Sequence, residues 1–313
     1  MPFKKNPQVF SSSISETVIG TGDSAITLGG ENVFPFYTFD APIKNAPVVG
    51  IEISDKGPDN RIPGIEAFYE GCESLADVAK RACEAEGASF ISLSLESSDP
   101  NGDNTSVEDC VEMCKEVADA ISLPLVIQGS SNAEKDSSML GKIAEALEGK
   151  NVLLMSATED NYKVIAVGAV QAYGQKISAE SAVDINLAKQ LNVVISQVGV
   201  GNEHIVMNVG AAASGYGFEY VASTMDRVKG AALTQNDDKL QIPIITPVAR
   251  EAWGVKESIV SEEDFPEWGP MEERGIGMEI STAVSCLASG SNAVILKHPE
   301  SVKTVSKFIS ELM

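Results

Sequence analysis

PVVGIEIS (47–54), LADVAKRACEAEG (75–87) and SFISLSLE (89–96) follow one another early in the chain and decide the fold. A β-branched run, a turn and an amphipathic stretch in this order predict βαβ units with parallel strands. The order continues to the C-terminus, where we expect six more strands at PLVIQG (124–129), NVLLMSA (151–157), KISAES (176–181), IVMNVG (205–210), IPIITPVA (242–249) and AVILKH (293–298). Eight such units predict an α/β fold, a closed (β/α)8 TIM barrel whose ligands bind at the loops after the strands.

Two segments test the count of eight. NYKVIAVGAVQAYG (161–174) and VDINLAKQLNVVISQVG (183–199) are rich in β-forming residues, and either could be an additional strand. In the second segment the apolar residues recur at helical spacing, with Asp184 placed as N-cap and Gly199 as terminator. The first has the length of a helix. We therefore predict that both are helices.

The N-terminal residues do not follow this order. SETVIGTGDSAITLGGENVFPFYTFDAP (15–42) alternates apolar and polar positions around Gly-Thr-Gly-Asp and Gly-Gly, as a β-hairpin would. We expect residues 1–46 to form an N-terminal extension with a β-hairpin that covers the bottom of the barrel. Residues 47–313 would form the TIM barrel.

The composition limits the partners. The formal net charge of −22 would repel phosphate groups, which argues against binding to nucleic acid or to anionic membranes. The acidic surface serves solubility, or it matches basic faces of partner proteins. No apolar run has transmembrane length, and MPFKKNPQVF (1–10) lacks the apolar core of a signal peptide, so we expect a cytoplasmic protein.

Histidines and cysteines give no metal-binding pattern. His204 precedes the sixth strand, whereas His298 ends the eighth strand on the functional face, where functional and structural roles are both open. Cys110 and Cys114 share one helix face, but an iron–sulfur cluster needs about four thiolates. We expect reduced thiols and no metal site in this chain.

Catalytic motifs are also missing from the sequence. GVGNEH (199–204) and GAAASGYG (210–217) match neither a dinucleotide fingerprint nor a P-loop, and there is no nucleophile elbow. Lys297 is the single candidate for a Schiff-base lysine. The loops after the strands are instead rich in Ser, Thr and Asn, which hydrogen-bond amide and carbonyl groups of a large polar ligand. This pattern favours a binding barrel without catalytic residues.

The longest predicted loop follows the seventh strand. It reads REAWGVKESIVSEEDFPEWGPMEERGIGMEIST (250–282) and contains both tryptophans, Trp253 and Trp268. Long loops with aromatic residues often carry binding sites, and exposed Trp and Arg anchor interfaces. The alternative is that both indoles pack over the edge of the barrel.

Several of these segments carry a family resemblance. ITLGGENVFPFYTFD (26–40), GYGFEYVASTMDRVKGAAL (215–233), PVAREAWGVKES (247–258) and WGPMEERGIGMEISTA (268–283) resemble the small subunit of the corrinoid iron–sulfur protein, the delta subunit family of the CO dehydrogenase/acetyl-CoA synthase complex. The likeness spans most of the chain. It implies a barrel akin to pterin-binding methyltransferases. It also implies a heterodimer with a large subunit that carries a [4Fe–4S] cluster and cobalamin, with the corrinoid between that subunit and the top of the barrel.

The resemblance further implies a methyl-carrying complex. A methyl group from methyltetrahydrofolate would reach the cobalamin through a separate methyltransferase and pass to acetyl-CoA synthase/CO dehydrogenase in the Wood–Ljungdahl pathway of anaerobes. This chain would then be a non-catalytic subunit that binds no cofactor alone.

Loop position selects nine candidates for the corrinoid side or the subunit interface: Ser130, Asn132, Thr158, Asn161, Asn208, Tyr216, Arg250, Glu251 and Trp253. Two alternatives remain. The chain could be a pterin-binding methyltransferase in its own right, with Asn208 or Asn161 contacting the pterin, or an aldolase-type barrel that acts through Lys297.

Overall fold

Eight parallel strands form the barrel in the computed structural model, which describes residues 6–313; the first five residues of the expected extension lie outside this part. The strands are β3 (Val48–Ser54), β4 (Phe90–Ser94), β5 (Leu125–Gln128), β6 (Leu153–Ala157), β7 (Lys176–Glu180), β8 (Ile205–Asn208), β9 (Ile245–Pro247) and β10 (Ala293–Leu296). They pair in the order β8-β7-β6-β5-β4-β3-β10-β9. A parallel bridge joins Met207 on β8 to Ile244, the residue before β9, and closes the sheet. The predicted TIM barrel is confirmed.

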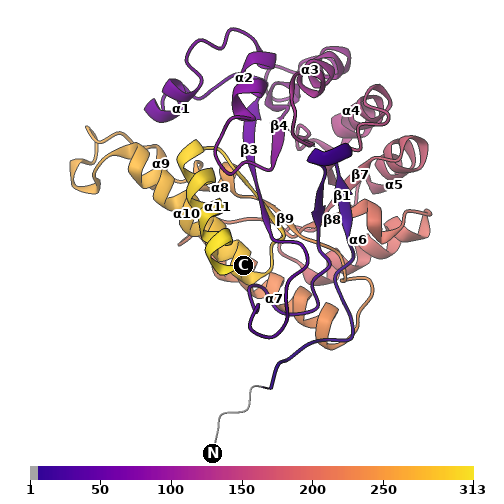
Figure 1. The fold of residues 1–313 in the computed structure, drawn as a ribbon. Coiled ribbons are helices and arrows are strands. Elements are labelled where there is room, and N and C mark those ends of the chain that lie inside the picture. Colours follow the sequence, from indigo (N-terminus) through magenta and orange to yellow (C-terminus); the bar gives the residue numbers. More distant parts are fainter. Residues whose placement is uncertain (1–5) are drawn as a thin grey trace, which may run out of the picture.

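Helices alternate with the strands and lie around them (Figure 1). They are α1 (Pro63–Phe68), α2 (Leu75–Ala82), α3 (Val107–Ala120), α4 (Ala133–Ala146), α5 (Tyr162–Ile165), α6 (Ile185–Gln197), α7 (Phe218–Thr234), α8 (Val248–Ala252), α9 (Lys256–Ile259), α10 (Met271–Ser289) and α11 (Pro299–Leu312). Both ambiguous segments are helical, as predicted. A π-helical turn over Ala166–Gln171 extends α5, and the Asp184 carboxylate accepts hydrogen bonds from two backbone N–H groups at the start of α6. No helix within residues 6–313 is long and apolar enough to cross a membrane.

The N-terminal hairpin closes the bottom of the barrel. Strands β1 (Thr17–Ile19) and β2 (Ile26–Leu28) pair antiparallel. Ile19 and Leu28 are fully buried in one cluster with the inward-facing apolar residues of the barrel strands. The Gly20 N–H donates to the Asn151 carbonyl (2.8 Å), just before β6 begins. The hairpin therefore supplies the lowest apolar layer of the barrel interior, in agreement with the prediction.

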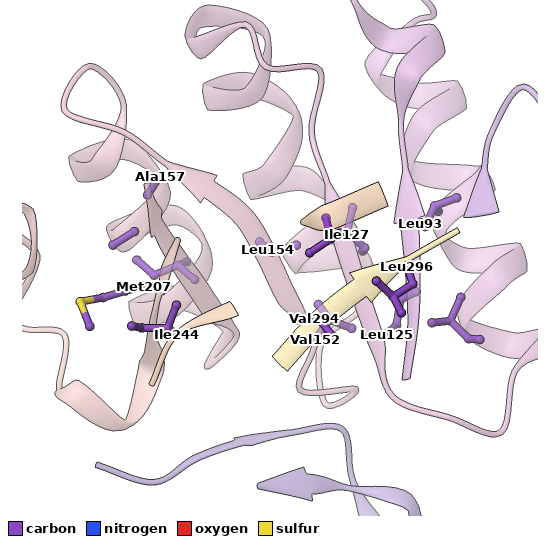
Figure 2. Packing of buried hydrophobic residues seen from close by; sticks show 14 of the residues in the cluster. Leu93, Leu125, Ile127, Val152, Leu154, Ala157, Met207, Ile244, Val294 and Leu296 are labelled. Carbon is purple, nitrogen blue, oxygen red and sulfur yellow. The ribbon is translucent and has the colours of Figure 1, made fainter. Parts of the chain in front are cut away.

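Two apolar clusters make up the core. The inner one fills the barrel above the hairpin, and the larger outer one lies between strands and helices. Figure 2 shows part of the outer cluster, including Leu93, Leu125 and Leu296 on three strands. In the inner layer, a Cβ atom at Gly50 would overlap the ring of Phe90. The glycine in PVVGIEIS thus makes room for the largest side chain of the interior.

The expected long loop after the seventh strand is the main correction. Strand β9 ends at Pro247, and α8 begins within the predicted strand; residues 250–282 then contain α9, a short 3-10 turn and the first part of α10. Two glycines near the start of α10 hid this helix in the sequence. One of them, Gly275, is a packing residue, since a Cβ atom there would overlap the ring of Trp253. The prediction of one continuous loop was therefore wrong.

Candidate ligand-binding site at the mouth of the barrel

A cavity of about 990 Å³ opens at the C-terminal end of the barrel, and residues at or just after the ends of all eight strands line it. Nine carboxylate-bearing side chains and four cationic side chains are among the lining residues. Seven of the nine predicted candidates line the cavity: Ser130, Thr158, Asn161, Asn208, Arg250, Glu251 and Trp253.

Two asparagines that line the cavity hold their amide groups in fixed orientations. The Oδ1 atom of Asn161 accepts from the Thr158 backbone N–H (2.7 Å) and hydroxyl (3.2 Å). The Oδ1 atom of Asn208 accepts from the Gly210 N–H (3.0 Å). Because each oxygen is held by a backbone donor, each Nδ2 group is directed away from that donor. Asn161 is 2 % exposed, and its Nδ2 has no hydrogen-bond partner among residues 6–313.

Glu52, on β3, is a cavity residue that the sequence analysis missed. The Gln128 Nε2 donates to Glu52 Oε2 (2.7 Å) and to the Ser92 hydroxyl (3.0 Å). Burial raises the pKa of Glu52 to about 7, with repulsion from Glu96 adding to it and the Gln128 hydrogen bond opposing it. Its signal in the sequence was a single carboxylate at an inward-facing position of an otherwise apolar strand.

Lys297 belongs to an ion-pair network on the cavity wall. Its Nζ lies 2.9 Å from Asp59 Oδ2, and Arg61 binds the same carboxylate through two nitrogens, each at 2.8 Å. The Arg61 hydrogen bonds and Lys297 hold the pKa of Asp59 well below its usual range, although burial opposes them. The lysine that could have formed a Schiff base is therefore engaged by a carboxylate.

Ser130 and Asn132 organise the loop between β5 and α4. The Ser130 N–H and hydroxyl both donate to Asp136 Oδ1 (2.8 and 2.7 Å), and burial raises the pKa of that aspartate. Asn132 is the N-cap of α4 and accepts from the Lys135 N–H (3.0 Å). Ser130 thus reaches the cavity, whereas Asn132 is a helix cap outside its lining.

Arg250 connects α8 across the mouth to the loop after β5, and Trp253 connects it to the end of the neighbouring strand β10. Arg250 donates to the Ser131 hydroxyl (3.0 Å), and this contact reaches the loop after β5. Trp253 is 8 % exposed and stacks on His298, with ring centroids 6.1 Å apart. His298 in turn caps α11 by accepting from the Glu300 N–H. Trp253 thus packs against His298 and also lines the cavity, and His298 forms the N-cap of α11.

Tyr216 lies outside the mouth. It lines a separate, open groove with Tyr220 and Arg227 along α7, and its hydroxyl donates to Glu257. Tyr216 is 50 % exposed and Tyr220 is 68 % exposed. The structure therefore places this candidate on the outer surface.

Histidine, cysteine and carboxylate side chains do not cluster as a metal site within residues 6–313. Cys110, Cys114 and Cys286 are buried, Cys72 and Cys83 are half-buried, and all five are free thiols. Burial raises the pKa of Cys110 to about 11 and that of Cys286 to about 12. Cys110, Cys114 and Cys286 lie on α3 and α10 and pack in the outer apolar cluster.

Comparison with known proteins assigns the family. The sequence model described as CO dehydrogenase/acetyl-CoA synthase delta subunit matches residues 16–305. The chain belongs to this family. It is 33% identical to the acetyl-CoA decarbonylase/synthase complex subunit delta of Archaeoglobus fulgidus, over 99% of this chain and 71% of that protein. The Methanopyrus kandleri subunit of the same name is also 33% identical, over 91% and 70%.

Solved structures with the same fold include dihydropteroate synthases. The enzyme from Vibrio fischeri superposes with a TM-score of 0.58 at 9% identity, covering 94% of this chain and 97% of that one. The Xanthomonas albilineans enzyme gives 0.54 at 11% identity, covering 95% and 97%. At these identities the similarity establishes the barrel fold alone.

Proposed function

We propose that this chain is the small subunit of a heterodimeric corrinoid iron–sulfur protein, and that the mouth of its barrel covers a corrinoid carried by the large subunit. In this role the complex accepts a methyl group derived from methyltetrahydrofolate through a separate methyltransferase, in the cytoplasm. It passes the methyl group to acetyl-CoA synthase/CO dehydrogenase in the Wood–Ljungdahl pathway. The [4Fe–4S] cluster belongs to the large subunit. Family membership supports the proposal, because the relatives are named as subunits of an acetyl-CoA decarbonylase/synthase complex.

The two directed amides of Asn161 and Asn208 are the observation that carries the corrinoid assignment. A corrinoid has a rim of amide side chains, whose carbonyl oxygens accept hydrogen bonds. The buried Asn161 donor at the cavity wall has no partner among residues 6–313, which is destabilising unless a ligand supplies an acceptor. The corrinoid cobalt supplies the methyl-carrying chemistry when bound, and the residues of this chain bind, orient and shield its rim.

Substitution of these amides tests the proposal. We expect Asn161→Ala and Asn208→Ala each to weaken association with the corrinoid-loaded large subunit about 5- to 100-fold, as for the loss of one buried hydrogen bond. Binding to the corrinoid-free large subunit is the control and should change little. Equal weakening in both cases would assign the asparagines to protein contacts, and no weakening would remove the corrinoid assignment.

A second candidate is a pterin-binding corrinoid methyltransferase that acts by itself. It is favoured by the fold, since one dihydropteroate synthase structure contains a pterine-sulfa conjugate and another contains pteroic acid. The cavity also has amide donors for a pterin ring, from Asn161 or Asn208. Calorimetry with methyltetrahydrofolate at millimolar concentration tests this candidate, because absence of binding would remove it. A separate assay with free cobalamin tests the small-subunit assignment, which predicts no turnover of methyltetrahydrofolate by the isolated chain.

A further inference from the structure

We propose that Glu52 is a proton-coupled specificity contact: when the mouth is covered, its carboxylate takes up one proton from water and donates the resulting O–H to an uncharged acceptor, such as an amide carbonyl oxygen, on the occupant. The inference rests on the proposed function, because it assumes that a corrinoid-bearing partner covers the cavity. It adds Glu52 to the proposed site and predicts that the site prefers amide oxygens to carboxylates on its ligand.

The position of Glu52 supports this role. One carboxylate oxygen, Oε2, is occupied by the Gln128 amide, and Gln128 is itself anchored on Ser92. The residue lines the cavity, and Oε1 has no hydrogen-bond partner among the described side chains and backbone groups. The Gln128 contact therefore fixes one oxygen and leaves the other for an occupant.

The charges that face Glu52 come from three elements. Glu96 follows β4 and Glu279 lies on α10, and both repel a negative charge on Glu52. Lys297, at the end of β10, attracts it, but the ammonium group of Lys297 is shared with Asp59. Covering the cavity removes water, which strengthens the carboxylate repulsion and increases the desolvation of Glu52. Both effects favour the neutral acid.

Two further polar groups indicate that the cavity is built for a ligand. The Asn161 Nδ2 group and the Tyr69 hydroxyl belong to residues that are 2 % and 6 % exposed and that line the cavity. Neither atom has a partner within residues 6–313. Together with a neutral Glu52 they form a set of donors. A ligand with several carbonyl oxygens satisfies this set, whereas a carboxylate would meet repulsion from Glu96.

Calorimetry of the full chain with the corrinoid-loaded large subunit tests the inference. Titrations at pH 8 in phosphate and in Tris, which differ in ionisation enthalpy, measure the protons exchanged on association. We expect the wild type to take up about one proton at pH 8 and almost none at pH 5.5, with affinity falling about tenfold per pH unit above 7. Glu52→Gln, an uncharged isostere that retains a donor, should abolish both the uptake and the pH dependence.

Glu148→Gln is the matched control, because Glu148 is an exposed carboxylate outside the lining of the cavity. It should take up protons as the wild type does. Association of the wild type without proton uptake would overturn this inference and leave the small-subunit assignment intact. The same uptake in Glu52→Gln as in the wild type would also overturn it. No association with the large subunit would overturn both proposals.

Discussion

Asn161 and Asn208 show how a backbone N–H sets the direction of a side-chain amide. Each Oδ1 accepts from a backbone group no more than three residues away, so local loop geometry orients the Nδ2 donor. The sequence identified both residues from their position after predicted strands. It could not show that the donors are directed, because that depends on the conformation of each loop.

Glu52 should make stability depend on pH. Its folded pKa of about 7 lies above the ordinary value of 4.5, so the folded state binds the proton more tightly than the unfolded state. Stability therefore falls as pH rises from about 4.5 to 7 and is level above that range. We expect the free energy of unfolding of Glu52→Gln to exceed that of the wild type by up to about 3 kcal/mol at pH 8, and by almost nothing at pH 4.

Urea unfolding at the two pH values measures this difference. The free energy of unfolding of Glu159→Gln should stay within about 0.5 kcal/mol of the wild-type value at both pH values, because that carboxylate is exposed. An equal effect of Glu52→Gln at pH 4 and pH 8 would show that its carboxyl group does not titrate as described.

Lys229 forms a buried ion pair with Glu31, and the two side chains are 2% and 7% exposed. Burial alone would raise the pKa of Glu31, but Lys229 and Asn292 outweigh it and lower the pKa. Lys229→Met leaves the carboxylate buried without its cation, and we expect a loss of about 3–5 kcal/mol in the free energy of unfolding at pH 7.

The double variant Lys229→Met/Glu31→Gln serves as the control for this pair. It should recover part of the loss, since no unpaired charge remains. A loss below 1 kcal/mol for the single variant in urea unfolding would contradict the role of this pair in attaching the N-terminal extension to α7.

At the scale of elements, the N-terminal hairpin replaces a layer of the barrel interior. Ile19 and Val18 are neighbours on β1, but Ile19 is fully buried in the inner cluster and Val18 is 41% exposed. We expect Ile19→Ala to lower the free energy of unfolding by about 2–5 kcal/mol, through lost burial and a cavity. Val18→Ala should change it by less than about 1 kcal/mol. Similar effects in the two variants, measured by thermal or urea unfolding, would contradict the role of the hairpin in closing the bottom of the barrel.

Most elements could be predicted from the sequence because their periodicity and their end signals agree. Strand β3 is a β-branched run between turns, and α6 has both an N-cap and a terminating glycine. Helix α10 could not be predicted, since Gly275 and Gly277 lower helix propensity there. The reason for Gly275 is the ring of Trp253, a contact between segments that the sequence alone does not show.

The site was predictable only in outline. The rule that barrel ligands bind after the strands placed seven of nine candidates on the cavity. Glu52 lies within a strand, and its importance depends on the Gln128 contact and on Glu96 and Glu279. Asn132 and Tyr216 were also selected by loop position, but neither lines the cavity. Asn132 is the N-cap of α4, and Tyr216 lines the outer groove along α7.

At the scale of the whole molecule, the extension and the barrel share one core. Ile19 and Leu28 complete the inner cluster, and the Glu31 pair joins the segment after the hairpin to α7. We expect a chain that starts at residue 47 to expose the inner apolar layer, to bind a hydrophobic dye and to lose its cooperative thermal transition. A cooperative transition at the wild-type temperature would show that the barrel folds without its extension.

The central claim is that this chain is the cofactor-free half of a methyl carrier. The most direct test is purification of the native complex under anaerobic conditions, followed by metal analysis and a visible spectrum of the complex and of this chain alone. We predict cobalt and iron in the complex, with a corrinoid spectrum, and neither metal in the isolated chain. A chain that purifies without a cobalt-containing partner, and that turns over methyltetrahydrofolate with free cobalamin, would contradict the account.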